Sequence, residues 1–200
     1  SNVNPTFYYS SLFSSFKVFK DAKSKNSIIP FRGPINSQSI SCAEDLNYRL
    51  IENDKYGFKN FNSVYKKEIN SVILGDSYAE GLCVDNENDI AGNLNKNKIS
   101  TINLGVTGSG PLTSLAVLKE YGNLFKPKNS VYLYFEGNDL DDLNWEKQDN
   151  NLIKYLNNNH KVNYLNKYKE IKFFLKKAAK ESENIARSRI KIKGYTKTVQ

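Results

Sequence analysis

Three polar, glycine-containing clusters have residue types that could form one catalytic site. They occupy residues 75–77 (Gly-Asp-Ser), 103–111 and 137–139 (Gly-Asn-Asp), and each follows a short apolar run. In open parallel sheets, ligands bind at the edge where the carboxyl ends of neighbouring strands converge. We therefore expect the three clusters to meet at one sheet edge, where side chains distant in the sequence can act together.

Acyl transfer is the chemistry that these residue types fit. Ser77 follows a glycine at an expected strand-to-helix turn, which exposes its hydroxyl near backbone N–H groups. Attack by a serine on an ester carbonyl creates an oxyanion, which needs hydrogen-bond donors about 3 Å away. The amides of Ser77 and Gly108 and the side chain of Asn138 can supply three donors. The sequence thus predicts a serine-dependent carboxylic-ester hydrolase with Ser77 as nucleophile and no cofactor.

Each cluster also has a simpler interpretation. Ser77 could be a helix N-cap, and we expect Asp76 to hold the turn by hydrogen bonds rather than to act as a base. The glycine-rich run at 105–110 could cradle the phosphate of a nucleotide or flavin, although it does not match the dinucleotide fingerprint. The acidic residues at 139–142 could bind a divalent metal, but acids at a helix start are the simpler explanation.

The three clusters resemble the first three conserved blocks of the SGNH (GDSL-type) hydrolases, in the same order. The resemblance implies a flavodoxin-like, three-layer α/β fold and hydrolysis of acyl or acetyl esters of lipids, carbohydrates or other small compounds. It also implies Ser77 as nucleophile and oxyanion donor, with Gly108 and Asn138 completing the oxyanion hole. The longer stretches GDSYAEGLCVD and YFEGNDL look like a bacterial, envelope-associated branch of that family, which implies an extracytoplasmic location.

Two features depart from the family pattern. Glu136 stands where the third block usually begins with glycine, and the late Asp-x-x-His that supplies the base has no match. The single histidine, His160, has Asn157 three residues before it. It could be the catalytic base, but we expect an ordinary surface histidine there. The chain contains no Met, so we expect a truncated polypeptide that is inactive alone and whose Asp and His lie beyond residue 200. The alternative is a catalytically incomplete domain that binds acylated carbohydrate or a partner protein.

Apolar runs alternate with helical patterns through the middle of the chain. This alternation predicts an α/β fold with a parallel sheet covered on both faces. The resemblance implies that this is the three-layer flavodoxin-like sheet, incomplete at its C-terminus. The expected strands lie at 71–75, 99–104 and 130–135, and the expected helices at 89–96, 112–125, 149–158 and 163–187.

We expect one domain in three parts, since 200 residues suit a single core. Residues 1–70 form an N-terminal arm and extension packed on the core, residues 71–145 the core with the three clusters, and residues 146–200 a basic helical segment. The formal charge of +8 comes from this last segment, which has 14 Lys and Arg against 5 Asp and Glu. Without a nucleic-acid-binding motif, we interpret it as a solvated face. The apolar stripe of the last helix predicts packing on the core, with a membrane surface as the alternative.

Cys42 and Cys83 are the chain's two cysteines, and neither has the neighbouring histidines that a zinc site needs. They are either two buried thiols or one disulfide. A disulfide that closes a loop of about 42 residues would contribute about 4 kcal/mol and would imply an oxidising, extracytoplasmic compartment. The expected partner of the protein is a small acyl ester, and the sequence predicts no oligomeric state.

Overall fold

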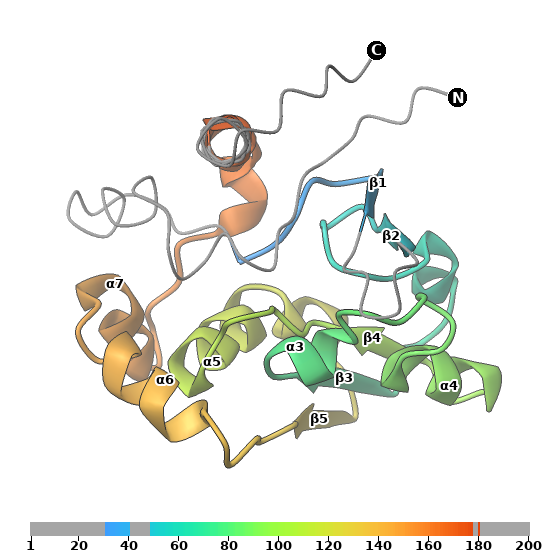
Figure 1. Cartoon of the computed structure of the whole chain (residues 1–200), viewed down its shortest axis with the longest axis horizontal. Helices are drawn as coiled ribbons and strands as arrows, with labels where there is room; N and C mark the ends of the chain where they lie inside the picture. The colour runs from blue at the N-terminus through green and yellow to red at the C-terminus, as the bar shows by residue number, and fades with distance from the viewer. Residues whose placement is uncertain (1–30, 41–48, 178–179, 181–200) are drawn as a thin grey trace, which may run out of the picture.

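A three-stranded parallel sheet lies at the centre of the computed structural model, which describes residues 31–40, 49–177 and 180 (Figure 1). Strand β3 (Ser71–Leu74) is in the middle, with β4 (Thr101–Asn103) on one side and β5 (Asn129–Tyr132) on the other. Both neighbours pair with β3 in parallel register. The mixed α/β class and the positions of the three strands are as the sequence predicts.

Helices supply the crossovers that parallel pairing requires. Short α3 (Ser77–Glu80) and α4 (Ile90–Lys96) connect β3 to β4, and α5 (Pro111–Glu120) followed by the 3-10 turn η2 (Gly122–Phe125) connects β4 to β5. Pro111 is the first residue of α5, where its missing N–H has no cost. The α-helix predicted at 112–125 ends at Glu120, and the rest of the predicted range forms the 3-10 turn η2.

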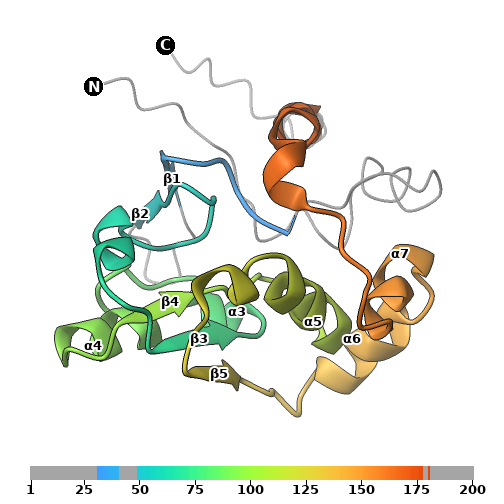
Figure 2. The same ribbon diagram turned by 180° about the vertical axis from the view of Figure 1, so that it is seen from behind.

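Both faces of the central strand β3 are covered. Val72 and Leu74 belong to the main apolar core, which α5 shares, whereas Ile73 packs with Ala79 of α3 and Ala91 of α4. Figure 2 shows the helices and the sheet from behind. β3 and β4 are buried at every position. This arrangement places the carboxyl end of β3 between helices, so that the residues after it enter a crowded environment.

Strand β5 differs from its predicted environment. We expected a strand covered on both faces, but all four of its residues are exposed, and Val131 is 43% exposed. It is an edge strand, paired with β3 and with no strand of the described residues beyond it. Its sequence, Asn-Ser-Val-Tyr, does not distinguish an edge from the middle of a sheet.

After β5 the chain is helical. Helix α6 (Asp139–Glu146) precedes α7 (Asn150–Ile153), η3 (Lys154–Leu156) and η4 (Tyr164–Lys167), and residues 168–177 continue as helix. The predicted helix at 149–158 is thus a short helix with a 3-10 turn. Ile171 and Leu175 are buried in the main core, so the apolar stripe packs as expected. No helix of the described residues has the length and apolar character to cross a bilayer.

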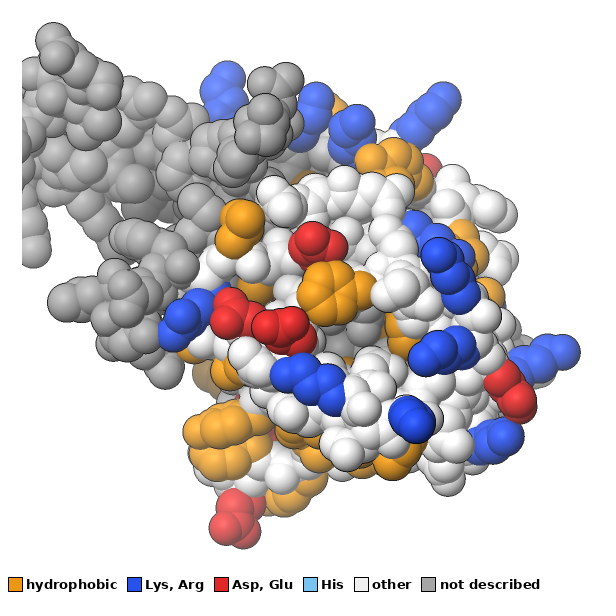
Figure 3. Space-filling model, turned by 90° about the vertical axis from the view of Figure 1, so that its right-hand side faces the viewer, with side chains coloured by type: hydrophobic (Ala, Val, Ile, Leu, Met, Phe, Trp, Pro, Cys, Tyr) orange, Lys and Arg blue, Asp and Glu red, His pale blue; other side chains and the backbone are white. Residues whose placement is uncertain are grey.

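The segment before β3 packs on the same core. It forms a two-stranded antiparallel sheet from β1 (Ser37–Ile40) and β2 (Leu50–Asn53) and then the 3-10 turn η1 (Asn62–Lys66). Phe31 lies 4.8 Å from the ring of Tyr164, so the first and last described parts meet. Around β2, η1 and α4, Lys and Arg side chains are spread over the surface rather than gathered in one place (Figure 3).

Candidate functional site

The first and second clusters are joined directly by hydrogen bonds. The carbonyl oxygen of Gly75 accepts from the amide of Val106 at 2.9 Å and from Ser109 Oγ at 3.1 Å. Gly105 lies so close to α3 that a Cβ there would be 2.3 Å from the amide nitrogen of Glu80. The loop after β4 is therefore packed against the turn that carries Ser77.

The second cluster contacts α6, the helix that follows the third cluster, where α6 lies against the start of α5. The buried carboxylate of Glu146 accepts from three amides, those of Gly110 at 2.8 Å, Leu112 at 2.8 Å and Thr113 at 3.2 Å. A Cβ on Gly110 would lie 2.8 Å from the Cβ of Asp142. Glu146 thus caps a helix that starts 35 residues before it in the chain and fixes α6 beside the glycine-rich loop.

The first cluster also contacts the segment that leads from β5 to the third cluster. Gly75 has φ +139°, which favours glycine, and a Cβ there would lie 2.8 Å from the carbonyl oxygen of Leu133. The rings of Tyr78 and Phe135 lie 4.8 Å apart. The first two clusters therefore contact each other, and both contact segments that flank the third cluster, Leu133 before it and Asp142 and Glu146 after it.

Ser77 is the first residue of α3 and is half-buried. The N-cap is Asp76, whose carboxylate accepts from the amide of Tyr78 at 2.9 Å. The prediction that Asp76 holds the turn is confirmed, and the alternative that Ser77 is the N-cap is wrong. Among the described residues, the Ser77 hydroxyl has no hydrogen-bond partner, so its oxygen is not committed to a structural role.

Two backbone N–H groups near this turn have no acceptor within the described chain, those of Ser77 and Gly108. Gly108 is exposed and has φ +73°, in a turn closed by the amide of Ser109 and the carbonyl of Val106 at 3.1 Å. A left-handed residue at this position of a turn favours glycine. Its amide remains available to a ligand.

Asn138 occupies the N-cap position of α6 and is half-buried. Its amide nitrogen donates to Asp142 Oδ2 at 2.9 Å, which uses one of its two hydrogens. Its oxygen, Oδ1, is buried without a partner. The side chain is thus anchored through one N–H while the other is free to donate.

Asp139 shapes the loop that precedes Asn138. It is fully buried, and its Oδ2 accepts from the Tyr132 hydroxyl at 2.7 Å and from the amide of Phe135 at 3.0 Å. Burial, together with this bond to Asp139, raises the pKa of Tyr132. The exposed Glu136, in the place of the family's glycine, lies within the loop that Asp139 holds.

The surroundings of Asn138 are acidic. Burial raises the pKa of Asp142, and the nearby carboxylates of Glu146, Asp139 and Asp76 raise it further. Asp139, Asp141 and Asp142 lie in the first turn of α6, as the simpler sequence interpretation predicts. In the part of the chain that the structure describes, no three acidic, Cys or His residues are grouped so that they could hold a metal ion.

A buried network of hydrogen bonds connects the segments that carry the first two clusters. Asn103, at the end of β4, accepts from the amide of Gly105 at 2.9 Å and donates to Ala79 O at 2.9 Å and to Asp89 Oδ2 at 3.1 Å. Its own backbone amide donates to Asn60 Oδ1 at 2.8 Å. Asn103 therefore connects the loop of Gly108 to the helix of Ser77.

Lys59 lies in the same network and is buried almost completely. Its Nζ donates to the carbonyl of Gly81 at 2.7 Å and lies 3.3 Å from Asp89 Oδ2. Burial lowers the pKa of Lys59, and the nearby carboxylate of Asp89 partly offsets this shift. No sequence motif indicated Lys59 or Asn60, because their partners are distant in the chain.

Glu80, at the end of α3, holds the loop that contains Gly108. Its Oε2 accepts from the amide of Thr107 at 2.8 Å and from the Thr107 hydroxyl. Burial raises the pKa of Glu80, although Thr107 and Lys59 oppose the shift. Glu80, three residues after Ser77, is thus bonded to Thr107, which directly precedes Gly108.

His160 is not brought to Ser77. It is half-buried with its ring 4.7 Å from that of Tyr155, whose hydroxyl donates to Glu120 at 2.9 Å. Glu120 is the last residue of α5, whereas the candidate site lies at its first residue, about 15 Å away. In the described chain, Ser77 therefore has no histidine within hydrogen-bond reach.

Cys83 is disulfide-bonded. Its expected partner, Cys42, lies outside the described residues. Cys83 follows α3 closely in the chain, so its bond restrains the segment just after the turn that carries Ser77.

The comparisons with known proteins add no relative. No family model, no curated protein and no solved structure matches this chain. The residues and their geometry are therefore the basis for a functional assignment.

Proposed function

We propose that this chain carries the nucleophile half of a serine-dependent carboxylic-ester hydrolase of the SGNH type. The observation that carries the proposal is that the first two clusters and the segments flanking the third contact one another beside a serine whose hydroxyl has no hydrogen-bond partner in the described chain. The amides of Ser77 and Gly108 and the second N–H of Asn138 are donors without an acceptor among the described residues. Preorganised donors of this kind are what an oxyanion requires.

The sheet order supports the same assignment. The strands lie in the order β4-β3-β5, so the first of the three in the chain is central, as in flavodoxin-like sheets. In such sheets the ligand site lies outside the carboxyl ends of the strands, which is where the three clusters are found.

The proposed reaction has two steps. Ser77 Oγ attacks the ester carbonyl, the oxyanion accepts hydrogen bonds from Ser77, Gly108 and Asn138, and the alcohol leaves as an acyl-serine forms. Water then attacks the acyl-serine and releases the acid. A base must take the proton of Ser77 and return it to the leaving alcohol. His160 lies at the far end of α5, so we assign this role to no residue of the described chain.

Labelling by a fluorophosphonate probe tests the proposal. The full-length gene product should become labelled, Ser77→Ala should abolish labelling, and Ser63→Ala, which removes an exposed serine of η1, should not. Equal labelling of the wild type and Ser77→Ala would contradict the proposal.

A second candidate is a catalytically silent domain that binds an acylated carbohydrate or a partner protein. The distance between His160 and the candidate site favours it, because a serine without a base is a poor nucleophile. A full-length gene product that lacks Asp-x-x-His and binds an acetylated sugar without hydrolysing it would support this candidate.

We further propose an extracytoplasmic location. Structural disulfides persist in oxidising compartments and are rare in the cytosol, and Cys83 is bonded. Quantifying free thiols in protein isolated from its native source, with and without a reductant, tests this location.

A further inference from the structure

Two exposed aromatic rings stand beside the candidate site. Tyr78 directly follows Ser77 and is 63% exposed, and Phe135 precedes Asn138 by three residues and is 40% exposed. Their centroids lie 4.8 Å apart with an interplanar angle of 39°. We call this pair the aromatic platform. It joins the residue after the nucleophile to the loop of the third oxyanion donor.

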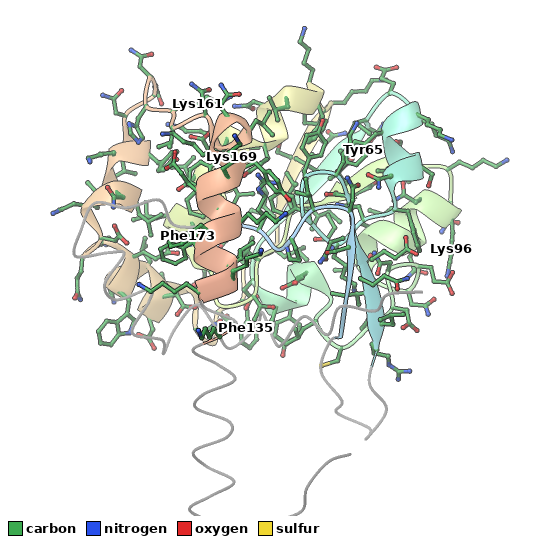
Figure 4. All side chains as sticks on the ribbon, turned by 90° about the horizontal axis from the view of Figure 1, so that it is seen from above. Tyr65, Lys96, Phe135, Lys161, Lys169 and Phe173 are labelled. Atoms are coloured by element: carbon green, nitrogen blue, oxygen red, sulfur yellow. The ribbon has the colours of Figure 1, made fainter. Side chains whose placement is uncertain are left out.

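The loop is built to hold the Phe135 ring where it is. A Cβ on Gly137 would lie 2.6 Å from Phe135 Cε1, so only glycine accommodates the ring without a shift. The buried carboxylate of Asp139 fixes the backbone by accepting from the Phe135 amide at 3.0 Å. Phe135 lies at the rim of the described molecule, far from Tyr65 and Lys96 (Figure 4).

The chemistry around the platform restricts its ligand. Three carboxylates lie next to the pair: Asp76 accepts from the Tyr78 amide, Asp139 from the Phe135 amide and Asp142 from the Asn138 side chain. Acidic surroundings disfavour anionic ligands. An aliphatic chain on rings this exposed would stay largely in water and gain little. A sugar ring instead covers an aromatic face with its apolar C–H face and keeps its hydroxyl rim hydrated, and carboxylates can accept from those hydroxyls.

We propose that Tyr78 and Phe135 form a stacking site for the sugar ring of a neutral, O-acylated carbohydrate, whose ester then faces Ser77. The inference rests on the proposed function for the orientation of the ester. It narrows the substrate class from acyl esters in general to those whose alcohol is a sugar.

Acetyl esters that differ only in their alcohol test the proposal. With the full-length gene product, Tyr78→Ala and Phe135→Ala should each lower kcat/KM for glucose pentaacetate about fivefold and change that for ethyl acetate less than about twofold. Tyr134→Ala is the matched control, because Tyr134 is 51% exposed on the same segment but outside the stacked pair, and it should change neither. Equal losses on both esters would overturn the proposal, as would a loss confined to ethyl octanoate, which would indicate an acyl-chain site.

Binding separates the platform from the esterase proposal. Ser77→Ala should bind glucose pentaacetate with saturable changes in its NMR spectrum, and the double variant Ser77→Ala, Tyr78→Ala should bind at least about fivefold more weakly. If binding depends on Tyr78 but the probe does not label the protein, the aromatic platform is supported and the esterase proposal is contradicted. Labelling with ring-independent binding retains the esterase and rejects the platform.

Discussion

The two halves of the candidate site are held by different means. The half that contains Ser77 and Gly108 rests on a buried network in which Lys59, Asp89 and Asn103 bond to one another or to the same backbone. The half that contains Asn138 follows the exposed edge strand β5 and is held chiefly by Asp139 and Glu146. The difference teaches that the turn of Ser77 is supported by an extended network in the core, whereas the position of Asn138 depends on two buried carboxylates beside an exposed edge strand.

Breaking the buried half should have the largest effect on stability. Lys59→Ala removes the cation beside Asp89, whose side chain is as buried as that of Lys59, and leaves that charge uncompensated. We expect a loss of about 3–5 kcal/mol in the free energy of unfolding, measured by urea denaturation. Lys67→Ala, an exposed control in the same segment, should cost less than about 0.5 kcal/mol; equal costs would show that the network does not hold this half.

Removing the carboxylate that holds the loop before Asn138 should lower the free energy of unfolding less than Lys59→Ala does, but it should lower ester hydrolysis more. Asp139→Ala leaves the Tyr132 hydroxyl and the Phe135 amide without their acceptor, at a cost of about 1–3 kcal/mol. Because the loop sets the position of Asn138, ester hydrolysis should fall at least about tenfold. The exposed Asp141→Ala is the control, and unchanged kinetics in Asp139→Ala would argue against an oxyanion role for Asn138.

The contact between α5 and α6 should have a smaller effect. Glu146→Gln retains an acceptor but removes the charge that faces three amides of α5. We expect a loss of about 1 kcal/mol in the free energy of unfolding. Glu136→Gln, an exposed carboxylate just before α6, should have no measurable effect in the same titration.

The smallest effect concerns pH. Burial raises the pKa of Glu80 above 4.5 in the folded protein, so the folded state binds this proton more tightly than the unfolded state. The contribution of Glu80 to stability should therefore fall as pH rises from 4.5 through the folded pKa. When the pH is lowered from 7 to 5, the free energy of unfolding of the wild type should rise relative to that of Glu80→Gln. A fall relative to Glu80→Gln would contradict the raised pKa.

The sequence predicts the central part of the fold because the signals there are local. The apolar runs before Gly75, at 101–103 and at 129–132 are strands, and Pro111 opens a helix. Asp76 was predicted correctly as a turn residue because its bond to Tyr78 spans two positions.

The remaining features depend on partners far apart in the chain. Glu146 is an unremarkable helical glutamate until α6 lies against α5, and Asn60 reaches Asn103 across 43 positions. The exposure of β5 was missed because an edge strand and a central one can share a composition. The role of Asp139 was hidden because acids at a helix start have a sufficient local explanation.

The cap that Glu146 provides has a consequence for the other ligand once considered for the glycine-rich loop. A phosphate bound by this loop would need hydrogen bonds from the backbone amides at the start of α5, where the helix dipole is positive. Those amides already donate to the protein's own Glu146 carboxylate, which is buried. A nucleotide phosphate could bind these amides only by displacing the Glu146 carboxylate and separating α6 from α5. The chain thus occupies this anion-binding position with one of its own side chains.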